Sequence, residues 1–359
     1  MSNCYIEYND KMAFHPGYYI KEVIDDMGIT QEDFAKRLDT TPKNLSLLIR
    51  GEQSLSIDIA TKLSRMLDTS IIYWLNLQNE FDALKAESIS DKMLEEEKNI
   101  YNIMDYSYFK TNYNLPVSGK DVDLSVTLIR RFLKLSSLTL LDKDNLSVCF
   151  RSKFELLSKE DRIKANTMVQ IATNEVLSVD APKYNKALFT NAIDYALKQT
   201  VNNDFYEDVR EAFYQAGVIL VVIPNFANSN TSGASKKVGD SVMLMVNDRK
   251  NYSDYFWFTM FHEIGHIMLG DFGISMDKEE GKKESEANDF ARNMLIPNDI
   301  YQEFVSRGEF GLQDIKNFAD EINRHPGIVA GRLIHDKIIK ENEEVNSLRK
   351  RFKIYRHEI

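Results

Sequence analysis

The sequence contains two histidines that flank a glutamate, in the order His262-Glu263-Ile264-Gly265-His266. On a helix, His262 and His266 lie one turn apart on the same face, so both imidazoles can bind one metal ion. Glu263 then lies beside the ion and can exchange a proton with a water molecule that the metal polarises. The spacing therefore predicts a zinc-dependent hydrolase in which Glu263 is the general base and acid.

A hydrolytic zinc ion needs a third protein ligand and an open position for water. A predicted helix over residues 284–295 offers Glu284 and Glu286. These two lie about 200° apart around a helix, so one of them faces the metal. Glu286 shares a face with larger apolar residues and Glu284 with alanines, which leaves both open. The 20-residue separation of Glu286 from His266 matches the ligand spacing of thermolysin-like enzymes and favours Glu286.

The predicted secondary structure that positions these residues differs between the two halves of the chain. The region from residue 15 to about 82 has the caps and apolar spacing of five short helices. Residues 83–200 are expected to be helical and contain no recognisable chemical motif. Beyond them the pattern predicts buried strands over 218–223 and 241–246, joined by a polar loop, and helices over 254–269, 284–295, 312–322 and 328–340.

These patterns predict a mainly α protein with a small β-sheet, of the α+β class. The expected domains are a helix-turn-helix domain over 1–82, a helical middle region over 83–200, a zincin-like metallopeptidase domain over 201–345 and a basic tail over 346–359.

Composition narrows the setting in which this chemistry is expected. The net charge of −10 argues against broad, nonspecific coating of nucleic acid but allows a local basic face. The two cysteines have no metal or disulfide spacing, which favours a reducing compartment. The amino terminus has no secretory pattern, and the longest apolar runs are too short to span a bilayer. We therefore expect a cytoplasmic protein without membrane contact.

The stretch Phe256–Leu269, the acidic helix that ends before Pro297 and the later His325-Pro326-Gly327 resemble the ImmA/IrrE metallopeptidases. The resemblance covers residues 120–340 and is strongest over 217–333. Members of that family use zinc to cleave helix-turn-helix repressors. The resemblance implies that His262, His266 and Glu286 bind zinc, that Glu263 is the catalytic carboxylate, and that the substrate is a repressor or antitoxin. Three candidates for the oxyanion donor stay open: Tyr252, Tyr255 and His325.

Residues 15 to about 82 are similar to HigA-type antitoxins of the Xre helix-turn-helix class. In such a domain the helix that begins at Pro42 enters the major groove. The residues then expected at DNA are Gln31 and Arg50 on phosphates, and Thr41, Lys43 and Asn44 near base edges.

Charge weakens the DNA-binding hypothesis and keeps a second one open. Residues 15–80 contain 7 Lys/Arg and 10 Asp/Glu, a net of 7 − 10 = −3. Phosphate binding needs a positive face, so the domain is alternatively a module that pairs with a related repressor or forms a homodimer.

The sequence is therefore compatible with two functions. The first is a zinc endopeptidase that regulates transcription, with its own helix-turn-helix domain directing it to operator DNA or to a repressor. The second is a DNA-binding autorepressor or toxin–antitoxin component whose peptidase-like domain is a sensor or scaffold.

Overall fold

The computed structural model describes residues 4–116, 121–144, 146, 148–151, 154–276 and 281–351. The chain divides into two compact units, Met1–Glu96 and Glu97–Ile359, which are described separately. Part of the expected basic tail, residues 352–359, lies outside the described residues. The α+β class is confirmed, since helices predominate and the strands form two small sheets.

The first unit begins with a β-hairpin that the sequence patterns did not predict. Strands β1 (Tyr5–Tyr8) and β2 (Lys11–Phe14) pair antiparallel. Asn9 and Asp10 form the turn with φ values of 50° and 58°. Positive φ at both central positions is what a tight hairpin turn requires, and Asn and Asp tolerate it better than most residues.

Five helices follow and form the expected bundle. They are α1 (Pro16–Met27), α2 (Gln31–Arg37), α3 (Pro42–Ile49), α4 (Ile57–Leu67) and α5 (Ile71–Tyr101). The side chains of Thr30, Thr41 and Ser56 cap α2, α3 and α4 by accepting backbone N–H groups. Phe34 and Trp74 are buried in the core that these helices share.

Helix α5 extends beyond residue 82, where the predicted helix-turn-helix domain ends. It continues for 31 residues to Tyr101. Residues 82–101 contain neither Gly nor Pro and are rich in Glu, Lys, Ala and Leu, which favour helix. The apolar period at the beginning of α5 does not continue through this stretch, but residues 83–101 are helical, as expected for the middle region.

The second unit is built on a four-stranded sheet in the order β3-β5-β4-β6. The predicted strands are confirmed as β3 (Val218–Ile223) and β5 (Ser241–Asn247), which pair parallel. Two further strands, β4 (Thr231–Val238) and β6 (Gly273–Met276), add antiparallel pairings. Strand β4 occupies half of what the sequence predicted as a loop.

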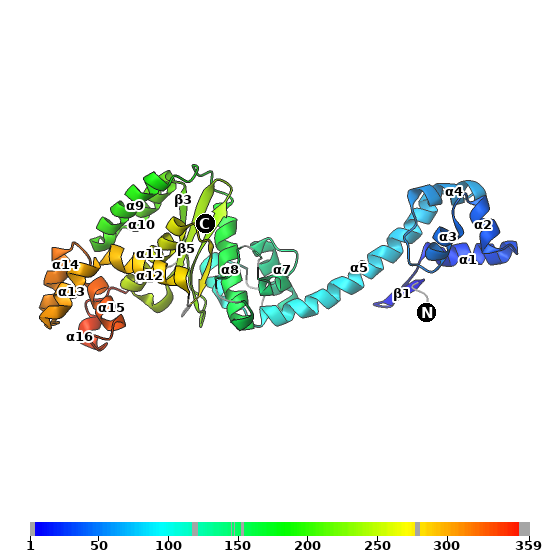
Figure 1. Cartoon of the computed structure of the whole chain (residues 1–359). Helices are drawn as coiled ribbons and strands as arrows, with labels where there is room; N and C mark the ends of the chain where they lie inside the picture. The colour runs from blue at the N-terminus through cyan, green and yellow to red at the C-terminus, as the bar shows by residue number, and fades with distance from the viewer. Residues whose placement is uncertain are drawn as a thin grey trace. The chain divides into compact units, whose positions relative to one another are not determined.

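Helices cover both faces of this sheet (Figure 1). Helix α8 (Lys159–Val176) packs on one face and α11 (Ser253–Leu269) on the other, so β3 and β5 are buried along their whole length. The remaining α-helices of the unit are α6 (Tyr106–Tyr113), α7 (Val122–Leu133), α9 (Lys186–Lys198), α10 (Tyr206–Gln215), α12 (Lys282–Leu295), α13 (Asn298–Arg307), α14 (Leu312–Glu321), α15 (Pro326–His335) and α16 (Glu343–Asn346).

A short segment from the middle of the chain lies along the outer edge of β6. Phe150 forms a parallel bridge with Ile274, and the N–H of Arg151 donates to the carbonyl of Ile274 at 3.2 Å. The Ile274 N–H in turn donates to the carbonyl of Cys149. Residues 149–151 therefore belong to the same packed unit as the sheet.

Among the described helices, none is both long enough and apolar enough to cross a membrane.

Candidate metal centre

The two motif histidines lie on the buried face of α11, where a second helix approaches closely. A Cβ atom on Gly265 would lie 3.1 Å from the Cα of Ala287 on α12 and 3.2 Å from the ring of Phe290. Glycine at this position thus lets α12 lie against the motif helix. Close packing of the two helices therefore accounts for Gly265.

Glu284, at the beginning of α12, is the acidic residue beside the histidines. Its carboxylate oxygens lie 3.2 Å from Nε2 of His262 and 3.1 Å from Nε2 of His266. Glu286 is 43% exposed and its nearest cation is Lys282 at 3.7 Å. The preference for Glu286 over Glu284 is therefore corrected. The close contact of Gly265 with Ala287 turns the alanine-lined face of α12, which includes Glu284, toward α11.

Polar partners hold both imidazoles in one orientation. Nδ1 of His262 lies 3.1 Å from Oδ1 of Asn288, and Nδ1 of His266 lies 3.1 Å from Oδ2 of Asp271. Burial alone raises the pKa of Asp271, but the hydrogen bond from Lys283 lowers it overall, so this carboxyl is ionised and accepts. Both Nδ1 atoms therefore donate, which leaves the Nε2 lone pairs directed at the centre.

These lone pairs converge on one small volume. The two Nε2 atoms are 3.1 Å apart, and the three donor groups lie within 4.8 Å of one another. Burial raises the pKa of Glu284, but the adjacent imidazoles lower it well below its usual range. A carboxylate and two imidazole lone pairs at these distances repel unless a proton or a metal cation lies among them. Two histidines and a glutamate are a ligand set of catalytic zinc, so the residues fit this metal.

Glu263 is fully buried beside the centre, and an arginine distant in sequence holds it. The Arg151 guanidinium donates to Oε2 of Glu263 at 3.2 Å and to Ser235 Oγ at 2.7 Å. It also hydrogen-bonds Ser275 and lies 3.4 Å from the carboxylate of Asp271. Oε1 of Glu263 has no hydrogen-bond partner among the residues that the structure describes. This oxygen is buried and faces the Gly233 backbone.

Strand β4 passes close to the same carboxylate. A Cβ atom on Gly233 would lie 2.7 Å from Cγ and 2.8 Å from Oε1 of Glu263. Glycine on β4 thus leaves the space that Glu263 occupies. The sequence prediction included neither the strand nor Arg151, since Arg151 has no distinguishing pattern around it.

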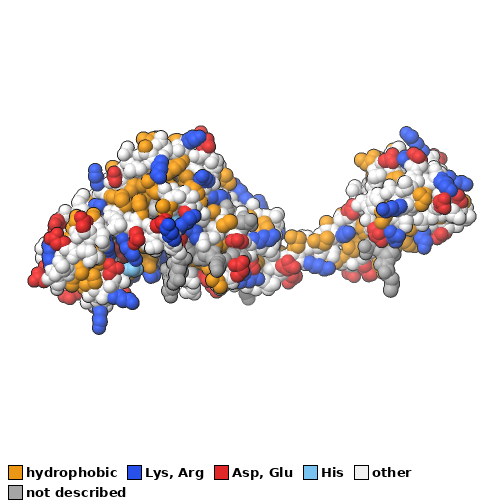
Figure 2. Space-filling view, viewed as in Figure 1, with side chains coloured by type: hydrophobic (Ala, Val, Ile, Leu, Met, Phe, Trp, Pro, Cys, Tyr) orange, Lys and Arg blue, Asp and Glu red, His pale blue; other side chains and the backbone are white. Residues whose placement is uncertain are grey.

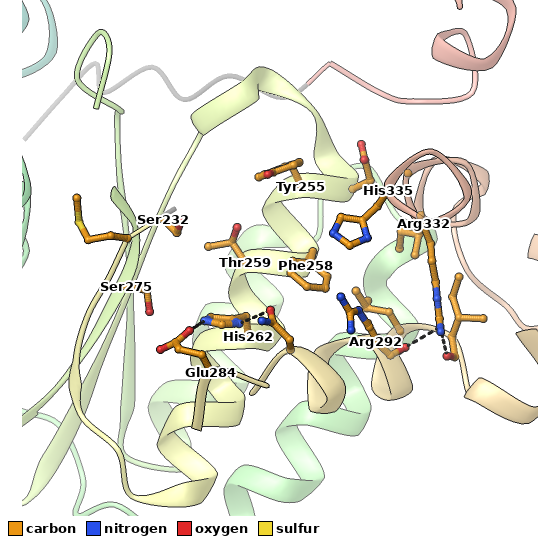
Figure 3. A pocket seen from close by; sticks show the side chains of 17 residues that line it. Ser232, Tyr255, Phe258, Thr259, His262, Ser275, Glu284, Arg292, Arg332 and His335 are labelled. Atoms are coloured by element: carbon orange, nitrogen blue, oxygen red, sulfur yellow. Dashed lines mark hydrogen bonds and ion pairs between the residues drawn. The ribbon is translucent and has the colours of Figure 1, made fainter. Parts of the chain in front are cut away.

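A pocket of about 330 Å³ opens beside the centre, with His262 and Glu284 in its wall (Figure 3). Of the three oxyanion candidates, Tyr255 borders this pocket. His325 caps α15 by accepting the N–H of Gly327. Tyr252 lies beneath the guanidinium groups of Arg349 and Arg351. Tyr255 has a contact of its own as well, since its hydroxyl accepts a hydrogen bond from Lys250 at 2.8 Å.

The predicted DNA contacts lie on α2 and α3 and at their ends. Lys43 and Asn44 are exposed in the first turn of α3, and Gln31 is half-buried at the beginning of α2. Thr41 is exposed but its hydroxyl caps α3 by accepting the N–H of Asn44 at 3.1 Å. Arg50 forms an ion pair with Glu52 at 2.8 Å. A phosphate contact by Arg50 would have to replace this pair.

Charges of both signs intermingle on the visible face of the first unit (Figure 2). Lys36 pairs with Glu32 at 2.9 Å, and Lys62 with Asp58 at 3.0 Å. These exposed pairs are weak, so a DNA phosphate can compete for the cations.

Comparisons with known proteins find matches to both the N-terminal and the C-terminal part of the chain. Residues 20–74 match the family described as helix-turn-helix, and residues 217–333 match the M78 peptidase family described as the IrrE N-terminal-like domain. An uncharacterised HTH-type transcriptional regulator of Escherichia coli K12, YddM, is 36% identical over 83 residues, which are 23% of this chain and 88% of that protein. Virulence-associated protein A' of Dichelobacter nodosus is 38% identical over 81 residues, 22% of this chain and 70% of that protein.

A solved structure from Nostoc punctiforme, provisionally described as an antidote protein of a plasmid maintenance system, is 31% identical. The match covers 23% of this chain and 92% of that one, with a TM-score of 0.23.

The fold and the site define a helix-turn-helix protein with a peptidase-like domain. The chain belongs to the helix-turn-helix transcriptional regulators through its N-terminal domain, and it carries an IrrE-like domain of the M78 peptidase family.

Proposed function

We propose that this protein is a cytoplasmic zinc endopeptidase that regulates transcription by cleaving a helix-turn-helix repressor or antitoxin. The observation that carries the proposal is the convergence of His262, His266 and Glu284 next to the buried carboxylate of Glu263, whose Oε1 has no hydrogen-bond partner within the described part of the chain. The helix-turn-helix domain supports a regulatory substrate over bulk peptides, because it can bring the chain to an operator or to a related repressor.

In the proposed mechanism, His262, His266 and Glu284 hold the zinc ion through Nε2, Nε2 and the carboxylate. When bound, zinc supplies Lewis acidity, which polarises a peptide carbonyl and acidifies a water molecule. Glu263 would accept a proton from the attacking water and return it to the leaving amine. Arg151 keeps the carboxylate in place through Oε2, and Asp271 and Asn288 keep the imidazoles oriented.

The proposal is tested by incubating zinc-loaded protein with helix-turn-helix repressors encoded near it in its native host. We expect the wild type to cut one of them into two fragments detectable by mass spectrometry. A Glu263→Gln variant removes the base and should slow cleavage about 10²- to 10⁴-fold. If the wild type and this variant leave every repressor equally intact, the peptidase proposal fails.

The complete burial of Glu263 supports a second candidate function. A base that is covered on all sides and paired with Arg151 also suits a domain that senses or scaffolds, in a DNA-binding autorepressor or toxin–antitoxin component. The same cleavage experiment separates the two functions. Zinc well below one ion per chain would further favour this second function.

DNA binding is proposed for the first unit, with Lys43 and Asn44 in the major groove. Replacing both by alanine removes one phosphate-attracting charge and one amide that can read a base. We expect operator affinity to fall roughly 10- to 100-fold, measured by fluorescence anisotropy on DNA from upstream of the gene.

A matched control for this experiment lies in the second unit. Lys316 and Asn317 are an adjacent, exposed lysine–asparagine pair on α14. Their replacement by alanine removes the same groups and should leave operator affinity unchanged. Equal affinities for both double variants would refute the groove assignment and favour a module that pairs with a repressor or with a second copy.

A further inference from the structure

The pocket beside the metal centre has an apolar wall that begins at the motif helix (Figure 3). Phe258 lies one turn before His262 on α11, and the two rings stack with centroids 6.4 Å apart. Leu295 at the end of α12 and the following Ile296 line the pocket, and Ile328 lines it from α15. At about 330 Å³, the pocket is at the lower end of the range for small-ligand sites. It offers an apolar surface for one large side chain.

Most charges in the wall of this pocket are already compensated. Asp254 is buried against Arg349, with oxygen–nitrogen distances of 2.9 to 3.2 Å. The Arg332 guanidinium donates to the carbonyls of Arg292 and Ile296 and stacks on the ring of Tyr301 at 3.7 Å. Neither Asp254 nor Arg332 is therefore free to attract a charged ligand.

The charge of Arg292 is less firmly paired than the charges of Asp254 and Arg332. Arg292 projects from α12 between Phe258 and Arg332 in Figure 3, and its side chain is 36% exposed. Its ion pair is with the exposed Asp289, three residues earlier, at 3.4 Å. A pair of this kind contributes little and yields readily to another carboxylate. Apart from Glu284, which belongs to the metal centre, the charge that the pocket offers a ligand is thus the positive charge of Arg292.

We propose that this pocket binds the substrate residue next to the cleaved bond, that it selects a large apolar side chain, and that Arg292 binds a carboxylate of the substrate beyond that residue. The inference rests on the proposed peptidase function and specifies its substrate class. The carboxylate belongs either to an acidic side chain or to the chain terminus. The pocket would favour such sequences over peptides that are small or basic at the same positions.

The test uses the full-length, zinc-loaded protein and calorimetric titration with hydroxamates, which bind zinc without being cleaved. Acetohydroxamate probes the metal alone. Succinyl hydroxamates with a methyl or a benzyl side chain probe the pocket, and each is made with a terminal amide, a terminal carboxylate or a glutamate amide. We expect the benzyl probe to bind at least about tenfold more tightly than the methyl probe, because its ring is transferred from water to the apolar pocket.

We expect one of the two carboxylate forms to bind about fivefold more tightly than the neutral amide, and the form that gains identifies the source of the carboxylate. Arg292→Ala should abolish this gain and keep the benzyl gain. Arg307→Ala, which removes an exposed arginine of α13, should change neither. Equal binding of methyl and benzyl probes, or a carboxylate gain that survives Arg292→Ala, would overturn the inference while zinc chemistry stands. If acetohydroxamate itself fails to bind, the proposed function fails as well.

Discussion

Replacing Glu284 by alanine is expected to weaken zinc binding by about 100-fold or more, whereas replacing Glu286 by alanine should leave it unchanged. Loss of an outer partner of a zinc ligand already costs about 10- to 100-fold, so loss of a ligand should cost at least as much. Glu286 lies half-exposed, paired with Lys282 at the surface. Affinities would be measured by competition with a chromophoric chelator.

The two variants are matched, since each removes one carboxylate from the first turns of the same helix. Circular dichroism should show that both keep their helices. A Glu284→Gln variant preserves the shape of the side chain. Its zinc affinity should nevertheless be low, because the amide lacks the negative charge. A loss of affinity confined to Glu286→Ala would reverse the assignment of the third ligand.

Replacing Arg151 by methionine is expected to destabilise the second unit by about 3 to 5 kcal/mol. The reason is that Glu263 would remain buried and charged without its partner: the two side chains are 6% and 0% exposed. In a Trp74→Phe background, Trp257 on α11 is the remaining tryptophan of the chain, so its fluorescence reports urea unfolding of this unit. Metal-free protein should be used, so that zinc affinity does not enter the comparison.

A double-mutant cycle separates the ion pair from general packing. Glu263→Gln should recover part of the stability lost in Arg151→Met, because the buried charge is gone. Arg210→Met is the surface control: it breaks an exposed pair with Glu207 and should cost less than about 1 kcal/mol. Additive losses for Arg151 and Glu263 would contradict the contact.

The motif itself was predictable because it depends on local spacing within one helix. The position of Glu284 was not, because it depends on how two helices meet. The decisive feature was present in the sequence: Gly265 and the alanines at 287 and 291 are small residues that let α11 and α12 approach. Spacing borrowed from another peptidase family pointed to Glu286 instead, two residues away on the opposite face.

Strand β4 and Arg151 escaped prediction for a different reason. The sequence of β4, from Thr231 to Val238, has small and polar residues where a buried strand usually has branched ones. Gly233 must be small because Glu263 fills the space above it. Arg151 reaches Glu263 across 112 positions of sequence, and this contact exists only because residues 149–151 pair with β6. Neither constraint has a local pattern.

The helix-turn-helix domain was predictable in its caps and core, since Thr30, Thr41 and Ser56 signal helix starts locally. Whether this domain binds DNA or another protein depends on its surface charge. The sequence left both alternatives open. Lys36 and Arg50 form exposed ion pairs with neighbouring glutamates, which a DNA phosphate can replace. A count of charges alone therefore does not decide whether the domain binds DNA.

The most direct test of the metal centre is X-ray diffraction from crystals of the zinc-loaded protein, with data collected on both sides of the zinc absorption edge. We predict one strong anomalous peak per chain, bonded to Nε2 of His262, Nε2 of His266 and a carboxylate oxygen of Glu284, with Glu263 close by. A protein that takes up no zinc at this position, or whose peak lies against Glu286, would contradict the proposed centre.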